Sequence, residues 1–280
     1  MRRVDAGSYL YWSDRRAVEI ASDNGINLSS RLNWTFKAAP QGIGAEVTKR
    51  DRPDLTRREK ARKIEKAIGA KAVTTFDSPP PARFAKGVGQ VHIARFTGGP
   101  ERDKGAMFHM RTTSGSGQQV DLVLFGSMDN FPGRTLRPSD APEAGWFSSA
   151  WYAIAELVES RGTRNTSQWD DPESLSVEAL NIALNQGNTG DPADHEGRPW
   201  TRGYTLAHAD NSEWFAQIYT DVVLTEGRWR LSGNMAGAQR ILVGAPVWVR
   251  TASPESVIRY AQLQDRPAAR SRFRRPPSVR

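Results

Sequence analysis

The chain has 280 residues, of which 38% are hydrophobic and nine are Trp, so it can bury a substantial core and is not a disordered protein. It contains no cysteine, which excludes disulfides, thiolate zinc sites and cysteine nucleophiles. Its net charge of +8 is concentrated in two places: residues 266–280 hold six Arg and no acid, and residues 49–71 hold ten basic residues against four acidic ones.

The N-terminal part alternates short strands and helices. Aromatic residues predict a strand over 8–12, and a helix follows over 13–22, with Asn24-Gly25 as its end. Two further strands are expected over 32–38 and 44–49. The stretch 55–68 is a predicted helix because Thr56 and Glu59 form a capping box and Gly69 stands at the stop.

Strands are then predicted over 89–96, 106–112 and 119–125, the last two joined in a hairpin by the loop TSGSG. The longest helical signal follows, over 140–162, where Asp140 and Glu143 suit the start and apolar residues recur at helical spacing. Its face carries two Trp and one Phe, so we expect this helix to be the central packing element of the fold.

The C-terminal part repeats the mixture of helices and strands. A helix over 171–186 is predicted from Asp171 and Pro172, then a hairpin from residues 203–208 and 213–224 around the polar sequence ADNS. A strand over 241–250 and a helix from Ser253 to about 264 complete the folded part. The Arg- and Pro-rich residues 266–280 read as a disordered tail.

The predicted fold class is therefore α+β, with mixed or antiparallel sheets in two halves packed around the helix at 140–162. Residues 1–265 read as one large domain. Two similar halves, about 8–135 and 165–265, are an alternative, because each has a strand with a His, a short polar loop and a strand with an Asp. Chance resemblance between hairpins accounts for the same pattern.

Common catalytic and nucleotide-binding motifs are missing. The sequence has no Walker A loop, no complete G-x-G-x-x-G, no H-E-x-x-H and no G-x-S-x-G. We therefore expect no cofactor and no metal site.

The candidate catalytic residues are His109 and His208, with Asp121 and Asp221 as the acids on the strands that follow. Histidine and carboxylate side chains that face one cleft can act as general acid and base. A partly buried histidine that serves only the packing of a strand is the alternative.

The basic stretch offers a candidate anion-binding site on one helix face, formed by Arg58, Arg62, Lys63 and Lys66. A solvated helix face explains the same pattern. The arginine-rich tail adds weak polyanion binding as a further expectation.

Three stretches taken together look like those of a known family. They are YLYWSD at 9–14, LFGS at 124–127 with Asn130, and DVVLTEGRW at 221–229 followed by ILVGAPVWV at 241–249. They resemble an uncharacterised actinobacterial, Streptomyces-type family known as a domain of unknown function. The resemblance implies a compact cytoplasmic α+β protein and transfers no active site.

Three functions follow as hypotheses. The first is a non-catalytic binding or accessory protein that recognises a small molecule or a protein partner. The second is an enzyme, a hydrolase that uses strand His and Asp residues, and the third is nucleic-acid binding through residues 49–71 and the tail. We expect a soluble, cytoplasmic protein with no membrane partner, because no apolar stretch has the length of a signal peptide or a membrane span.

Overall fold

The computed structural model describes residues 9–28, 37–39, 42–44, 55–96, 105–133, 171–184 and 204–264, and all statements below concern these residues. The chain divides into two compact units. One unit comprises residues 1–13 and 71–280, and the other comprises residues 14–70.

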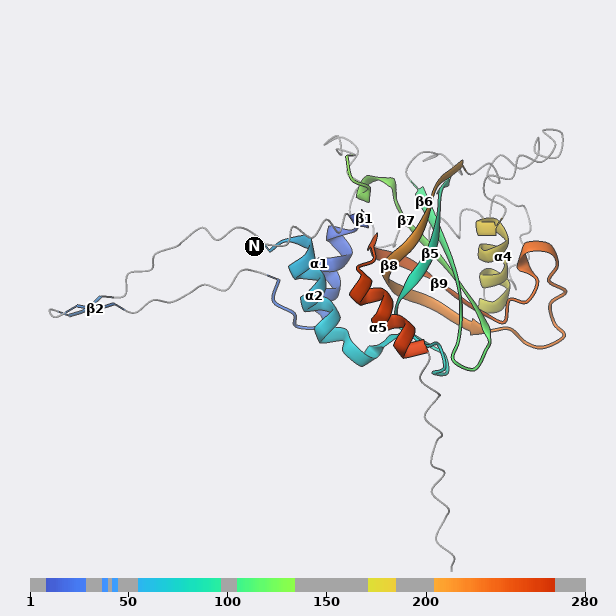
Figure 1. Ribbon diagram of the computed structural model, residues 1–280, viewed down its shortest axis with the longest axis horizontal. Helices are drawn as coiled ribbons and strands as arrows, with labels where there is room; N and C mark the ends of the chain where they lie inside the picture. Colours follow the sequence, from blue (N-terminus) through green and yellow to red (C-terminus); the bar gives the residue numbers. More distant parts are fainter. Residues whose placement is uncertain are drawn as a thin grey trace, which may run out of the picture. The chain divides into compact units, whose positions relative to one another are not determined.

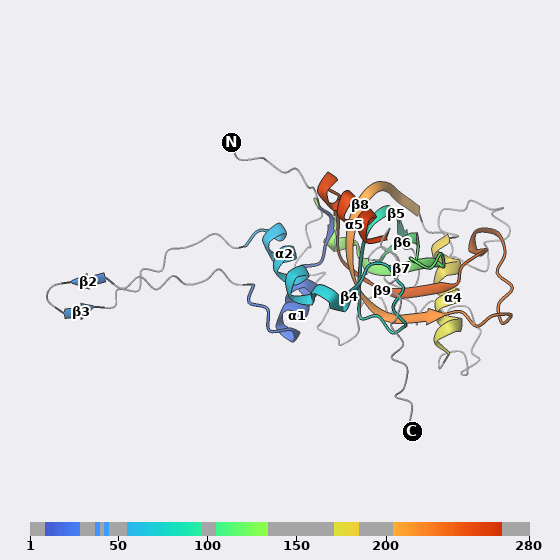
Figure 2. The same ribbon diagram turned by 60° about the horizontal axis from the view of Figure 1, so that its bottom comes forward.

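Five strands of the larger unit close into a barrel: β5 (Phe84–Phe96), β6 (Gly105–Thr113), β7 (Gln119–Ser127), β8 (Tyr204–Val223) and β9 (Arg240–Thr251). β6 lies antiparallel between β5 and β7, and β7 runs parallel to β9. β8 is antiparallel to both β9 and β5, so it closes the ring (Figures 1 and 2). Two short strands extend the sheet, β1 (Tyr9–Trp12) beside β9 and β4 (Ala72–Val73) beside β5.

The topology is a Greek key, because β5, β6 and β7 follow one another and β8 returns to lie beside β5. A closed five-stranded Greek-key barrel is the architecture of the OB-fold class. Many unrelated functions occur on such barrels, so the function has to be argued from the site.

Alternation along the strands separates the inside of the barrel from its outside. Ile93, Phe108 and Leu122 lie in one buried cluster with residues of β8 and β9, which is the barrel interior. Met107 and Val123 belong to a second buried cluster on the outer face.

Helix α4 (Pro172–Leu184) covers that outer face (Figure 1). Its buried side chains include Leu175, Ala179 and Leu180, which share a cluster with residues of β6, β7 and β9. The helix begins where Asp171 accepts hydrogen bonds from the Glu173 backbone N–H and the Ser174 hydroxyl. The predicted helix at 171–186 is thus confirmed within two residues at its end.

A stack of aromatic rings joins four strands on another part of the outer surface. Trp12 of β1 stacks on Trp248 of β9 with 5.7 Å between ring centroids, and Trp248 stacks on Phe215 of β8 at 4.5 Å. Phe215 in turn stacks on Phe84 of β5 at 5.8 Å. These contacts reinforce the seam at which β8 meets β9 and β5.

The smaller unit contains helices α1 (Asp14–Asp23) and α2 (Arg57–Ile68) and the short hairpin β2 (Lys37–Ala39) with β3 (Gly42–Gly44). Both predicted helices are confirmed. The capping box is present as expected, because Thr56 Oγ1 accepts from the Glu59 N–H and the Glu59 carboxylate accepts from the Thr56 N–H.

Two predictions are corrected. The two sheets expected in two halves are instead one closed barrel, since β8 pairs with strands from both halves. The hairpin expected at ADNS is one strand of 20 residues, β8, with a bulge in which Asn211 has φ 51°. The strands predicted over 32–38 and 44–49 lie mostly outside the described residues, of which β2 covers 37–39 and β3 covers 42–44.

The helix predicted at 140–162 and the tail at 266–280 lie outside the described residues, so their predictions stand as they were. α5 (Pro254–Gln264) confirms the last predicted helix. In the part of the chain that the structure describes, no helix combines the length and apolar character needed to cross a bilayer.

The seam between β8 and β9 has no room for a side chain at Gly244, because an added Cβ would collide with the carbonyl oxygen of Gln217. We predict that Gly244→Ala lowers the free energy of unfolding in urea by about 1–3 kcal/mol, as overpacking does. Gly89→Ala is the matched control in β5, where a Cβ meets open space, and should leave stability equal or slightly higher. Equal stability of both variants would contradict the tight seam.

Candidate functional site

Barrel closure brings three histidines into one row on the outer face. His92 of β5 is paired directly with His109 of β6 and with His208 of β8. Residues paired in this way point to the same face of a sheet. The ring centroids of His92 and His109 are 5.9 Å apart, and those of His92 and His208 are 4.7 Å apart. The exposure rises along the row from buried His109 to exposed His208.

A buried carboxylate orients His109. Asp121 of β7 is fully buried, and its Oδ1 lies 2.9 Å from Nε2 of His109. Oδ1 also accepts a hydrogen bond from Nε of Arg111 at 2.8 Å, and Oδ2 accepts from the Gln119 amide at 3.1 Å. Because three donors surround one carboxylate, Asp121 is held in a single position.

These hydrogen bonds decide the charge of Asp121. Burial acts to raise the pKa of this carboxyl, but the hydrogen bonds from His109, Arg111 and Gln119 outweigh burial and hold the pKa below its ordinary value. An ionised carboxylate only accepts hydrogen bonds. Nε2 of His109 therefore carries a proton, and Nδ1 is the ring nitrogen that remains to accept one when the imidazole is neutral.

The other two histidines form a pair. Nδ1 of His92 lies 2.6 Å from Nδ1 of His208, so one of these nitrogens donates the proton that the other accepts. Burial lowers the pKa of His92, and the neighbouring His109 and His208 lower it further, against a smaller opposing effect of Asp210. Two imidazolium rings would each direct an Nδ1–H at the other, so the contact requires one Nδ1 without a proton.

The row of histidines lines a pocket of about 400 Å³, within the usual size range of small-molecule sites. We call it the histidine pocket. Its lining comes from β5, β6, β8, α4 and the β8–β9 loop: Gln90, His92, Ile93, Ala94, Met107, His109, Arg111, Ala183, Leu184, His208 and Asn234. Among the described residues this lining contains no carboxylate: Asp121 binds His109 and Arg111, and Asp210 binds Gln90 at 2.8 Å, but neither belongs to it.

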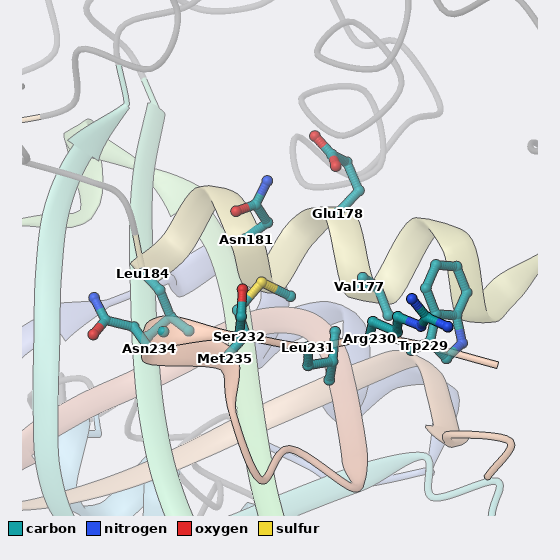
Figure 3. Close-up of a pocket in the computed structure, with 11 residues that line it drawn as sticks. Val177, Glu178, Asn181, Leu184, Trp229, Arg230, Leu231, Ser232, Asn234 and Met235 are labelled. Carbon is teal, nitrogen blue, oxygen red and sulfur yellow. The ribbon is translucent and has the colours of Figure 1, made fainter. Parts of the chain in front are cut away.

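A second pocket, of about 530 Å³, lies between α4 and the β8–β9 loop (Figure 3). We call it the loop pocket. It is lined by Val177, Glu178, Asn181, Leu184, Trp229, Arg230, Leu231, Ser232, Gly233, Asn234 and Met235. Leu184 and Asn234 line both pockets.

The four predicted catalytic residues do not all meet. His109, Asp121 and His208 belong to the row described above. Asp221 makes a separate buried ion pair with Arg240 at 2.7 Å and accepts the Ala82 backbone N–H at 2.8 Å. Arg240 also donates to the carbonyl of Phe76 at 2.6 Å, so this pair ties the segment before β5 to β8 and β9.

The predicted anion-binding residues lie on α2, in the smaller unit. Arg58, Arg62 and Lys66 are exposed. Lys63 donates to the backbone carbonyl of Asn27 at 2.8 Å, so it also has a structural contact. Anion binding by this helix remains a prediction.

Sequence reasoning did not assign site roles to His92, Arg111 and Gln119. A weak signal existed for Arg111 and Gln119, since both lie on the outer face of a hairpin whose register the loop TSGSG fixes. No such local signal existed for His92, because its neighbours His109 and His208 are set by the register of β5 with β6 and β8.

Within the described residues no group of three or more His, Cys, Asp or Glu side chains is arranged to hold a metal ion. Comparison of the chain with family models, curated proteins and solved structures gave no match. The site is therefore interpreted from its own geometry.

The environment of His92 predicts its titration. We expect an imidazole pKa below the ordinary value of about 6.5 in the folded protein, measured by NMR, and a return to that value in concentrated urea. The unfolded chain then binds this proton more strongly than the folded one. The His92 contribution therefore lowers the free energy of unfolding as the pH falls below about 6.5. A folded-state pKa at or above the unfolded value would contradict this environment.

Proposed function

We propose that the histidine pocket binds a small molecule through an anionic group, such as a phosphate or a carboxylate. The observation that carries this proposal is the convergence of His92, His109 and His208 with Arg111 on a single pocket. If these histidines served only the packing of the strands, we would not expect all three to line the same cavity as the Arg111 guanidinium.

The chemistry of the lining supports an anion rather than a cation. Arg111 uses Nε for Asp121 and Nη2 for the Asn234 carbonyl at 2.9 Å, and among the described residues its Nη1 has no hydrogen-bond partner. Histidine and arginine N–H groups donate to phosphate or carboxylate oxygens. Among the described residues of the lining no carboxylate balances the charge of a cation, and the Arg111 guanidinium would repel it.

Anion binding is coupled to protonation. An anion beside His92 favours its charged form, so binding takes up a proton and raises the pKa of His92. The affinity for an anion therefore increases as the pH falls through the pKa of His92. The lowered pKa of His92 keeps this ring uncharged at neutral pH until a ligand is bound.

A hydrolase is the second candidate, and the hydrogen bond between Asp121 and His109 is the observation that favours it. A carboxylate that fixes one imidazole nitrogen leaves the other to act as a general base. Nδ1 of His109 takes a proton from water while the water oxygen bonds to the phosphorus or acyl carbon of the substrate. The bond to the leaving group breaks, and that group takes the proton that His109 received from water, so His109 returns to its neutral form.

The binding proposal predicts a specific NMR result. Inorganic phosphate added at pH 6.5 should shift the imidazole signals of His92 and His208 and raise the pKa of His92. Arg111→Gln should weaken this binding about tenfold or more, as the loss of a charge-assisted hydrogen bond does. Arg83→Gln is the matched control, since Arg83 is an exposed arginine outside the lining. Unchanged imidazole signals at saturating phosphate would overturn the proposal.

The hydrolase candidate predicts turnover of bis(p-nitrophenyl) phosphate or p-nitrophenyl acetate. His109→Gln keeps an amide N–H for Asp121 but removes the base, so kcat should fall by about 10²-fold or more. Phosphate binding should persist in this variant, because the other donors of the pocket remain. Equal rates for the wild-type protein, the variant and buffer with both substrates would leave binding as the function.

A further inference from the structure

We propose that the histidine pocket and the loop pocket form one site for a two-part ligand, in which an anionic group is joined to a planar, uncharged ring. The chemical class is that of nucleoside phosphates and other aryl phosphates. This inference rests on the proposed function, because it assigns the anionic group to the histidine pocket.

The two pockets meet at residues that they share. Leu184, at the end of α4, and Asn234, in the β8–β9 loop, line both of them. In Figure 3 these two residues lie at one end of the loop pocket, and Trp229 and Arg230 lie at the other. A ligand that enters the loop pocket at this end therefore starts beside the histidine pocket.

The loop that forms one wall is held at both ends. Near its start, the Trp229 indole N–H donates to Glu173 at 2.8 Å, and Arg228 forms an ion pair with Glu173 at 3.1 Å. Near its end, the Asn234 carbonyl accepts from Arg111, which also donates to Asp121. The same guanidinium thus fixes the loop and the histidine row, and a wall fixed before binding lowers the entropic cost of ordering on association.

The loop pocket suits an uncharged ring. Val177, Leu184, Leu231 and Met235 give it apolar patches within a lining that is largely polar, and Trp229, whose ring lies 5.0 Å from the Arg228 guanidinium, adds an aromatic side chain. Thioether and indole groups make favourable contacts with flat rings. Glu178 and Arg230 carry opposite charges, so the pocket has no excess of either sign for an ionic group. Asn181 and Ser232 add polar atoms that can pair with the edge of a heterocycle.

The experiment compares three probes by calorimetry at pH 6.5: adenosine 5′-monophosphate, inorganic phosphate and adenosine. If the pockets act together, the nucleotide should bind at least about tenfold more tightly than either part, because the second contact becomes intramolecular. Inorganic phosphate should still bind by itself.

The variant Ser232→Trp fills the loop pocket with a large side chain. Ser232 is exposed and belongs to the described lining of the loop pocket but not to that of the histidine pocket. The substitution should weaken nucleotide binding about tenfold while phosphate affinity stays within about twofold. Met235→Ala, which removes an apolar side chain of the loop pocket, should have the same selective effect. Val223→Trp is the matched control, an exposed β8 residue outside both linings.

The outcomes separate the two proposals. If phosphate does not bind, the anion-binding function fails, and the two-part site fails with it. If phosphate binds but the nucleotide binds no more tightly, or Ser232→Trp weakens both equally, only the two-part site is overturned.

Discussion

Closure of the barrel by β8 is the constraint on which the rest of the structure depends. This strand pairs with β5 over most of its length and with β9 over its second half. Without it, His208 would have no place beside His92. The aromatic stack through Trp248 and Phe215 reinforces the same seam, and the absence of a side chain at Gly244 allows the two backbones to approach. The candidate site is thus a consequence of how the sheet closes.

Asp121 is the electrostatic centre of that site. A buried carboxylate is costly unless hydrogen bonds and a cation compensate for the lost hydration. His109, Arg111 and Gln119 provide this compensation from β6 and β7. Asp121 therefore fixes both a histidine that faces the pocket and an arginine that reaches the β8–β9 loop. The carboxylate itself stays out of the lining and leaves the pocket with donor groups.

Two buried aspartates on the barrel, Asp121 and Asp221, differ in what their partners do. Asp221 forms an ion pair with Arg240, and Arg240 also donates hydrogen bonds to backbone carbonyls of the segment before β5. This pair holds chain segments together and presents nothing to a pocket. Asp121 instead binds His109 and Arg111, and both of these residues line the histidine pocket. The same residue type on two strands thus has a structural role in one place and a candidate functional role in the other.

Local sequence signals determined the elements whose ends depend on neighbouring residues. The Thr56–Glu59 box, the Asp171–Pro172 start and the loop TSGSG act within a few residues, so the helices α2 and α4 and the β6–β7 hairpin followed from the sequence. The sequence ADNS led to a wrong prediction, because Asn, Asp and Ser suit a turn. In the structure Asn211 lies in a bulge, and β8 remains paired with β5 on both sides of it. Only the tertiary structure decided that His92 lies between His109 and His208 and that Asp221 pairs with Arg240. His92 and His208 are 116 residues apart in the chain, and Asp221 and Arg240 are 19 apart. Both contacts are set by strand register, which depends on the closed sheet as a whole rather than on any local stretch.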